Sequence, residues 1–426
     1  MKVNDIRDVF KPDDENHERR DHERRAATFL PEPELRERTY TIISVDDHLI
    51  EPMDIFDGRV AQKFAEEVPR VVEDGNGGQA WLFQGEMQHR LGISAVAGRP
   101  LEECAYDPDR FEYMRPGTYD PDARIHDMDL DGIYASVCFP SGLVGFGGQH
   151  LQVGVEPELA KALMLAVNDW HLEAWSARHP DRLIPIQIPY LLDVEFAAAE
   201  VRRNAERGFK ALTFPEAPHK LGLPSLHTGH WDPLFAACDE TGTTVCLHVG
   251  SSSDAPTTAP DAPIDTTSVL FFGQAMFTAV DWLYSKIAVR NPGLKICFSE
   301  GGIAWVPGVI DRLNHIEPYQ RIFGTWKGLD MSPAELFHRN FWFCALDDPS
   351  TMVLRHTIGV DRIMVEADYP HLDSSWPNTQ DKFERHFRGL PADEVDAMTW
   401  GNASELFRHA VPASVRAAVA AATVQS

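Results

Sequence analysis

The segment YTIISVDD, residues 40–47, is a nearly continuous apolar run that ends in acidic residues. Seven runs of the same kind follow it, at residues 134–141, 183–190, 210–216, 244–250, 295–300, 341–347 and 361–368. Such runs are typical of strands that are buried on both faces of a parallel sheet. Helical patterns lie between most of them, at residues 156–178, 194–207 and 233–241.

Eight strands that alternate with helices predict an α/β fold, the parallel (β/α)8 TIM barrel. A doubly wound open sheet is the competing architecture. The dinucleotide-binding version of that sheet is disfavoured, because no G-x-G-x-x-G motif follows the first run.

The length of 426 residues suggests two or three domains, yet one barrel with insertions can reach this size. We predict a charged N-terminal arm at residues 1–38 and a single barrel domain at residues 39–426. Within the barrel, residues 49–133 are expected to form an inserted lid subdomain after the first strand. Residues 250–267 are expected to form an active-site loop, and residues 394–426 to form C-terminal helices.

The charge balance disfavours several classes of partner. Acidic residues outnumber basic ones by 65 to 39, for a net charge of −26, so we expect neither nucleic acid nor an anionic membrane as a partner. No transmembrane run and no signal peptide is found, which predicts a cytoplasmic protein. The six cysteines form no C-x-x-C pair and are expected to be reduced structural thiols. The charged arm suggests a homo- or hetero-oligomer.

Ionisable side chains gather at the ends of four predicted strands. These ends meet on one face of a barrel, where such enzymes place their sites. The residues are Asp46, His48 and Glu51 after the first strand, His248 after the fifth, Glu300 after the sixth, and Asp368 and His371 after the eighth. Imidazoles and carboxylates are the ligands of Zn²⁺, Mn²⁺ or Fe²⁺, so the sequence predicts a divalent-metal site.

Each of these residues alone has a simpler explanation. A single histidine at a strand end is usually an ordinary hydrogen-bonded residue, and an aspartate there commonly caps the next helix. Glu51 could cap a helix or form a salt bridge, and His371 could orient Asp368 without binding the metal itself. The metal site is favoured because the set recurs at matching ends of four strands.

Five motifs resemble the amidohydrolase-related family of metal-dependent (β/α)8 barrels, which includes aminocarboxymuconate semialdehyde decarboxylase and resorcylate-type decarboxylases. They are VDDHLIEP at 45–52, LHVG at 247–250, SEGGIAW at 299–305, EADYPH at 366–371 and GNASELF at 401–407. The resemblance spans roughly residues 40–410.

The resemblance assigns roles to individual positions. It implies that His248 is the ligand of strand five and Asp368 the ligand of strand eight. Asp46 and His48 match the family's H-x-H or E-x-H pair. Glu300 stands where many members carry an acid/base histidine, which is a departure from the decarboxylase pattern.

Seven candidate ligands are too many for one tetrahedral ion and about the right number for two ions bridged by carboxylate. The expected cofactor is a divalent metal, zinc, manganese or iron, as one or two ions. Glu300 and Asp368 are the predicted catalytic residues, with Glu300 moving a proton or binding metal. The leading hypothesis is metal-dependent hydrolysis or nonoxidative decarboxylation of a small carboxylate- or carbonyl-bearing substrate. One alternative is an O2-dependent hydroxylase with a dinuclear iron or manganese centre, similar to a small oxygenase branch of the superfamily. The other is a non-catalytic barrel subunit that supports a partner.

Overall fold

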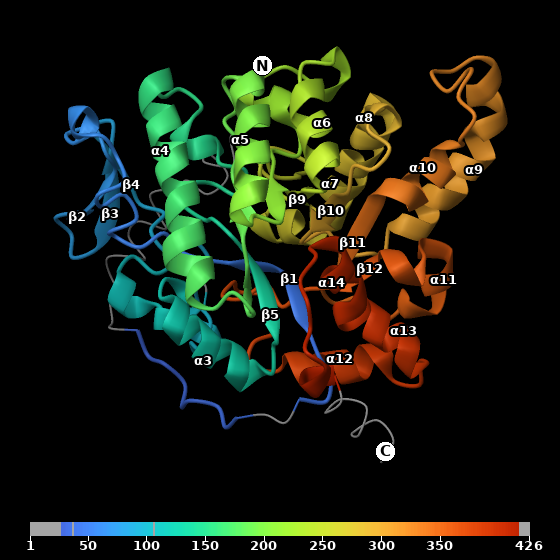
Figure 1. Ribbon diagram of the computed structural model, residues 1–426. Coiled ribbons are helices and arrows are strands. Elements are labelled where there is room, and N and C mark those ends of the chain that lie inside the picture. Colours follow the sequence, from blue (N-terminus) through green and yellow to red (C-terminus); the bar gives the residue numbers. More distant parts are fainter. Residues whose placement is uncertain (1–26, 36–37, 105–106, 417–426) are drawn as a thin grey trace.

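The computed structural model describes residues 27–35, 38–104 and 107–416 and is built around one parallel sheet (Figure 1). Its strands are β1 (Ile43–His48), β5 (Ala135–Phe139), β6 (Leu183–Ile184), β7 (Ile186–Gln187), β8 (Ala211–Thr213), β9 (Thr244–His248), β10 (Ile296–Ser299), β11 (Phe341–Ala345) and β12 (Ile363–Val365). Each of the eight predicted runs therefore contains a strand.

The sheet closes into a barrel. Its strand order is β6-β5-β1-β12-β11-β10-β9-β8-β7, so β6 and β7 lie at its two ends. Only Pro185 separates these two strands along the chain, and proline cannot donate a ladder hydrogen bond. They are halves of one interrupted strand, and the predicted (β/α)8 barrel is confirmed.

Alternate residues of the strands fill the barrel interior. Ile43 and Val45 on β1 belong to one buried cluster with Leu406 and Phe407 from the C-terminal region. Thr244, at the start of β9, donates a hydrogen bond to the carbonyl oxygen of Leu406. The C-terminal helix α14 (Asn402–Leu406) therefore covers the amino ends of the strands, and the carboxyl ends are left to carry polar side chains.

The helices follow the expected pattern. The longer ones are α4 (Pro157–Trp170), α5 (Val194–Arg207), α6 (Asp232–Thr241), α7 (Ile264–Ser285), α9 (Val306–Ile322), α10 (Pro333–Asn340) and α12 (Thr379–Phe387); the short ones are α8 (Ile287–Arg290), α11 (Arg355–Ile358) and α13 (Ala392–Asp396). Helix α5 begins after Asp193, whose side chain accepts two backbone N–H bonds, and ends at the left-handed Gly208.

Two predicted boundaries differ from the structure. The expected helix at 156–178 is α-helical only to Trp170 and continues as one π-helical turn and one 3-10 turn. The expected loop at 250–267 ends earlier, because helix α7 begins at Ile264. An apolar run follows the last residues of the expected loop, and the helix that this run forms also includes those last residues.

The segment between β1 and β5 carries a small sheet of its own. Strands β2 (Arg70–Glu73), β3 (Gln79–Phe83) and β4 (Glu86–Gln88) pair antiparallel, beside α4 in Figure 1. The same segment ends in α3 (Pro121–Asp131), which leads into β5. Its role as a lid stays a prediction.

The two ends of the chain were expected to form an arm and closing helices. Residues 27–35 contain no helix or strand, and their run passes below α3 in Figure 1. Residues 1–26 and 417–426 lie outside the described part. No helix of the described residues has the length and apolarity needed to cross a bilayer.

Candidate metal centre

Four predicted ligands meet at the carboxyl ends of β1, β9 and β12. The Nε2 atoms of His48 and His248 are 3.0 Å apart. Asp368 Oδ1 lies 3.3 Å from His48 Nε2. Asp46 Oδ1 lies 3.7 Å from His48 Nε2, and Asp46 Oδ2 lies 3.6 Å from His248 Nε2. All four side chains have no exposed surface. Two imidazoles and two carboxylates thus face one point.

His371 and Glu300 adjoin this point from two sides. The His371 ring stacks on the ring of His48 at 3.8 Å between centroids, and its Nδ1 lies 3.0 Å from Asp368 Oδ1. Glu300 Oε2 lies 3.3 Å from His248 Nε2, and its side chain is 10% exposed. Six of the seven sequence candidates are therefore brought together.

Three groups of donor atoms could each hold an ion among the described residues. They are Asp46, His48 and His248; His48, Asp368 and His371; and Glu300, Asp368 and Asp373. Asp373 was missed by the sequence analysis, because its place depends on the path of the loop after β12. Asp368 and His48 each belong to two groups, so these groups overlap in one extended cluster.

The buried polar atoms of the cluster fit a cation. Both carboxylate oxygens of Asp46 and of Asp368, as well as Nε2 of His371, are buried without a hydrogen bond of regular geometry, although Asp368 Oδ1 lies 3.0 Å from His371 Nδ1. Buried polar atoms are nearly always satisfied, and an ion is one way to satisfy them. Two nitrogens bonded to one tetrahedral zinc ion at about 2.1 Å stand roughly 3.4 Å apart, slightly more than the 3.0 Å between the two Nε2 atoms here.

The backbone is strained at two of the carboxylates. Glu300 has φ +54° and Asp368 has φ +57°, a left-handed region that non-glycine residues rarely adopt. The Glu300 N–H donates to Oε2 of the buried Glu366, and the Asp368 N–H donates to the carbonyl oxygen of Asp46. Strain of this kind persists where surrounding contacts impose it and is common at functional sites.

Burial shifts the titration of the cluster toward neutral forms. It raises the pKa of Asp46, Glu300 and Asp368 well above their usual range, and neighbouring carboxylates raise these values further. Burial also lowers the pKa of His248 to about 3 and that of His371 to about 4. Neutral imidazoles are the form that binds metals, and a cation would restore the charged carboxylates.

Glu51 does not join the cluster, which corrects the expectation that it is a ligand. Its Oε1 accepts backbone N–H bonds from Ser141 at 2.8 Å and Val144 at 3.2 Å, and its Oε2 accepts one from Leu143 at 3.3 Å. The chain after β1 is bonded to the last residue of β5, because the Leu49 N–H donates to the carbonyl oxygen of Phe139. This path turns Glu51 toward the loop after β5.

Asp47 and Glu366 are further buried carboxylates that the analysis of motifs did not assign. Asp47 accepts hydrogen bonds from the Ser44 and Ser136 hydroxyls and from the Tyr369 N–H, so it ties β1 to β5 and to the loop after β12. The pKa of Glu366 is raised to about 8 by burial. Glu366 stands two positions before Asp368, a spacing that could have marked it.

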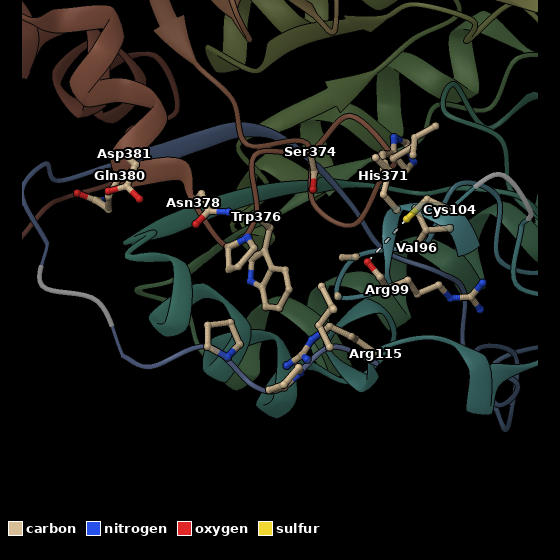
Figure 2. A pocket seen from close by; sticks show the side chains of 18 of the residues that line it. Val96, Arg99, Cys104, Arg115, His371, Ser374, Trp376, Asn378, Gln380 and Asp381 are labelled. Carbon is tan, nitrogen blue, oxygen red and sulfur yellow. Dashed lines mark hydrogen bonds between the residues drawn. The ribbon is translucent and has the colours of Figure 1, made fainter. Parts of the chain in front are cut away.

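A separate cavity of about 830 Å³ lies beside the centre, between the N-terminal arm, residues 96–104 and the loop after β12 (Figure 2). His371 is the residue that it shares with the cluster. Its Arg115 guanidinium lies 4.6 Å from the ring centroid of Trp376 and pairs with Asp127. Among the described residues, the cavity therefore shares only His371 with the candidate metal cluster.

The comparisons with known proteins agree with this fold. The model of the family described as amidohydrolase matches residues 112–409. A crystal structure of an amidohydrolase from Mycobacterium avium subsp. paratuberculosis K-10 is 23% identical, with a TM-score of 0.67 over 86% of this chain and 99% of that one.

Two decarboxylase structures also share the fold. One is 2,6-dihydroxybenzoate decarboxylase from Rhizobium, at 18% identity and a TM-score of 0.56, over 87% of this chain and 99% of that one. The other is 5-carboxyvanillate decarboxylase from Novosphingobium aromaticivorans DSM 12444, complexed with manganese and 4-hydroxy-3-methoxy-5-nitrobenzoic acid. It is 19% identical, with a TM-score of 0.59 over 89% of this chain and 100% of that one. With the family model covering well over half of its length, the chain belongs to the amidohydrolase family.

Proposed function

We propose that this protein is a metal-dependent enzyme that hydrolyses or nonoxidatively decarboxylates a small carboxylate- or carbonyl-bearing molecule. The observation that carries the proposal is the convergence of Asp46, His48, His248 and Asp368 on one point. The orphaned carboxylate oxygens of Asp46 and Asp368 support it. A divalent ion at such a set supplies Lewis-acid activation of a substrate oxygen or of water.

Glu300 is proposed as the group that moves the proton. Its carboxylate contacts His248 and keeps 10% of its surface exposed, whereas the four proposed ligands are fully enclosed. It can therefore touch both a molecule at the centre and the solvent. His371 is proposed to hold Asp368 through its Nδ1 contact or to act as a ligand itself.

A second candidate function is O2-dependent hydroxylation at two ions. The group Glu300, Asp368 and Asp373 favours it, because this group shares Asp368 with the one around His48. A shared carboxylate is suited to bridging two ions, and carboxylate-rich pairs of iron or manganese activate oxygen.

The test compares reloaded protein in the presence and absence of oxygen. Chelated protein is reloaded with zinc, manganese or iron and assayed with 5-carboxyvanillate, 2,6-dihydroxybenzoate and related carboxylated phenols and their esters. Metal-dependent release of CO2 or alcohol without oxygen supports the proposal. Turnover that requires oxygen supports the hydroxylase, and no turnover with any metal supports a non-catalytic subunit.

Two variants refine this assay. Asp368→Asn should abolish turnover with the fold retained, as circular dichroism reports. Asp361→Asn, at an exposed carboxylate paired with Arg362, is the matched control and should behave as the wild type.

A further inference from the structure

Phe146 is an aromatic side chain that touches the metal cluster from the loop after β5. Its ring centroid lies 4.2 Å from that of His248, 4.8 Å from that of His48 and 6.1 Å from that of His371. Phe139 also contacts the imidazoles of His48 and His248, but it is fully buried. Phe146 is only partly buried.

The side chains that contact the buried imidazoles differ in exposure. His48, His248 and Asp368 have no exposed surface, whereas Phe146 and Glu300 both contact His248 and both keep some. Phe146 and Glu300 are therefore partly exposed side chains that border His248.

The loop that carries Phe146 is held in one shape. Its sequence, SGLVGFGG at residues 141–148, is rich in glycine, yet its backbone is pinned. The Glu51 carboxylate accepts three of its N–H groups, those of Ser141, Leu143 and Val144. The Thr213 hydroxyl donates to the carbonyl oxygen of Phe146.

Two glycines of this loop lie so close to backbone atoms of other segments that a side chain would not fit without a shift. A Cβ at Gly142 would clash with the carbonyl oxygen of Arg90, and one at Gly147 would lie 3.0 Å from the backbone nitrogen of Pro215. Free rotation of the loop is thereby restricted, and the Phe146 ring has a defined place.

We propose that Phe146 determines substrate specificity by offering an apolar wall for a flat aromatic or conjugated acid, and that Glu51 is the positioning residue that holds this wall. The inference rests on the proposed function and names its substrate class. An aromatic ring gains from an offset or edge contact with a second ring at about 4.5–7 Å, beyond its apolar area. Glu51 thus acts on the substrate through the loop and not through the metal.

The test measures binding by calorimetry to manganese-loaded protein, with benzoate and cyclohexanecarboxylate as the pair of probes. The two acids have the same charge and a similar size, but only benzoate is flat. Wild-type protein should bind benzoate more tightly by roughly two- to tenfold. The ratio should approach one in Phe146→Leu and be kept in Phe146→Tyr. An unchanged ratio in Phe146→Leu, or no binding of either acid, overturns the proposal.

Glu51→Gln replaces an all-acceptor carboxylate with an amide that turns a donor toward the loop N–H groups. It should lower the benzoate preference as Phe146→Leu does while leaving the metal content unchanged. Glu206→Gln, at an exposed glutamate on α5, is the matched control. Loss of metal with an intact preference would make Glu51 a ligand and overturn its positioning role.

Metal content per chain distinguishes a failure of the role of Phe146 from a failure of the proposed metal-dependent function. Metal-loaded protein without the benzoate preference defeats the inference about Phe146 alone. Protein that binds no metal defeats the proposed function, and the inference falls with it. If Glu51→Gln does not fold, the two Phe146 variants still decide the role of the wall.

Discussion

The Nε2 atoms of His48 and His248 lie 3.0 Å apart, although the two residues are 200 positions apart in the sequence. Their strands, β1 and β9, are not neighbours in the sheet, because β12, β11 and β10 lie between them. In a closed ring of eight strands, they stand on opposite sides. The contact therefore exists because the barrel closes and both side chains point across its carboxyl end.

Replacing one of these histidines should empty the centre. His248→Ala removes one of two imidazole donors, so we expect its metal content per chain to fall at least tenfold below that of the wild type. His227→Ala removes a histidine that pairs with Asp281 at the surface and should keep the wild-type content. Equal metal content in both variants would exclude His248 as a ligand.

Glu300→Gln separates proton transfer from metal binding. The amide keeps the shape of the side chain but cannot carry the proton, so turnover should fall by about 10²- to 10⁴-fold. The metal content should stay at the wild-type level. A drop from about two ions per chain to about one would instead identify Glu300 as a ligand of a second ion.

Glu216 should make stability depend on pH. It is buried, and its carboxylate accepts bonds from the Gly250 N–H, the Gln274 amide and the Thr278 hydroxyl. Burial raises its pKa to about 7, so the folded chain keeps a proton that the unfolded chain loses above about pH 4.5. The free energy of unfolding therefore falls as the pH rises from about 4.5 to about 7. Below and above this interval, Glu216 adds no further pH dependence.

Urea unfolding of the wild type and Glu216→Gln at pH 5 and pH 7.5 measures this contribution. Between pH 5 and pH 7.5, the free energy of unfolding should fall by about 3 kcal/mol more in the wild type than in the variant. An identical pH dependence in both proteins would show that Glu216 does not retain its proton in the folded chain.

Arg124 should be one of the costliest single residues to remove. It is fully buried and donates to the carbonyl oxygens of Gly117 and His48, with its guanidinium 4.4 Å from the ring centroid of Tyr369. Arg124→Met leaves these oxygens unpaired and removes a cation that opposes the burial-driven rise in the pKa of Asp47. We expect a loss of about 3 kcal/mol in the free energy of unfolding.

The control for this variant is Arg202→Met, which breaks an exposed pair with Glu240. An exposed pair contributes about 1 kcal/mol or less. If urea unfolding gave similar losses for the two variants, the buried guanidinium would not support the strand end that carries His48.

The fold could be predicted because its signal is local and repeated. Each apolar run holds a strand, and the interruption at Pro185 falls inside the third run. The predicted end of the loop at 250–267 was wrong, because the first turn of α7 carries Asp265 and Thr266, which match a loop as well as a helix N-terminus.

The convergence of the candidate residues could be predicted where it depends on strand ends, and the structure departs from the prediction at several loop residues. His48 and His248 end strands, so the barrel alone brings them together. Glu51 lies three residues beyond a strand, and its direction is set by hydrogen bonds to the β5 region that spacing does not reveal. Asp373 and Phe146 lie on loops, and only the folded paths of these loops bring them to the centre.

The most direct test is the metal content per chain, measured by plasma mass spectrometry on wild-type protein after repletion with zinc, manganese and iron. The account predicts at least about one divalent ion per chain, lost in His248→Ala and kept in His227→Ala. About two ions per chain would favour the two-ion arrangement through Asp368. No bound metal after repletion would contradict the account, because the convergent imidazoles and carboxylates would then have another purpose.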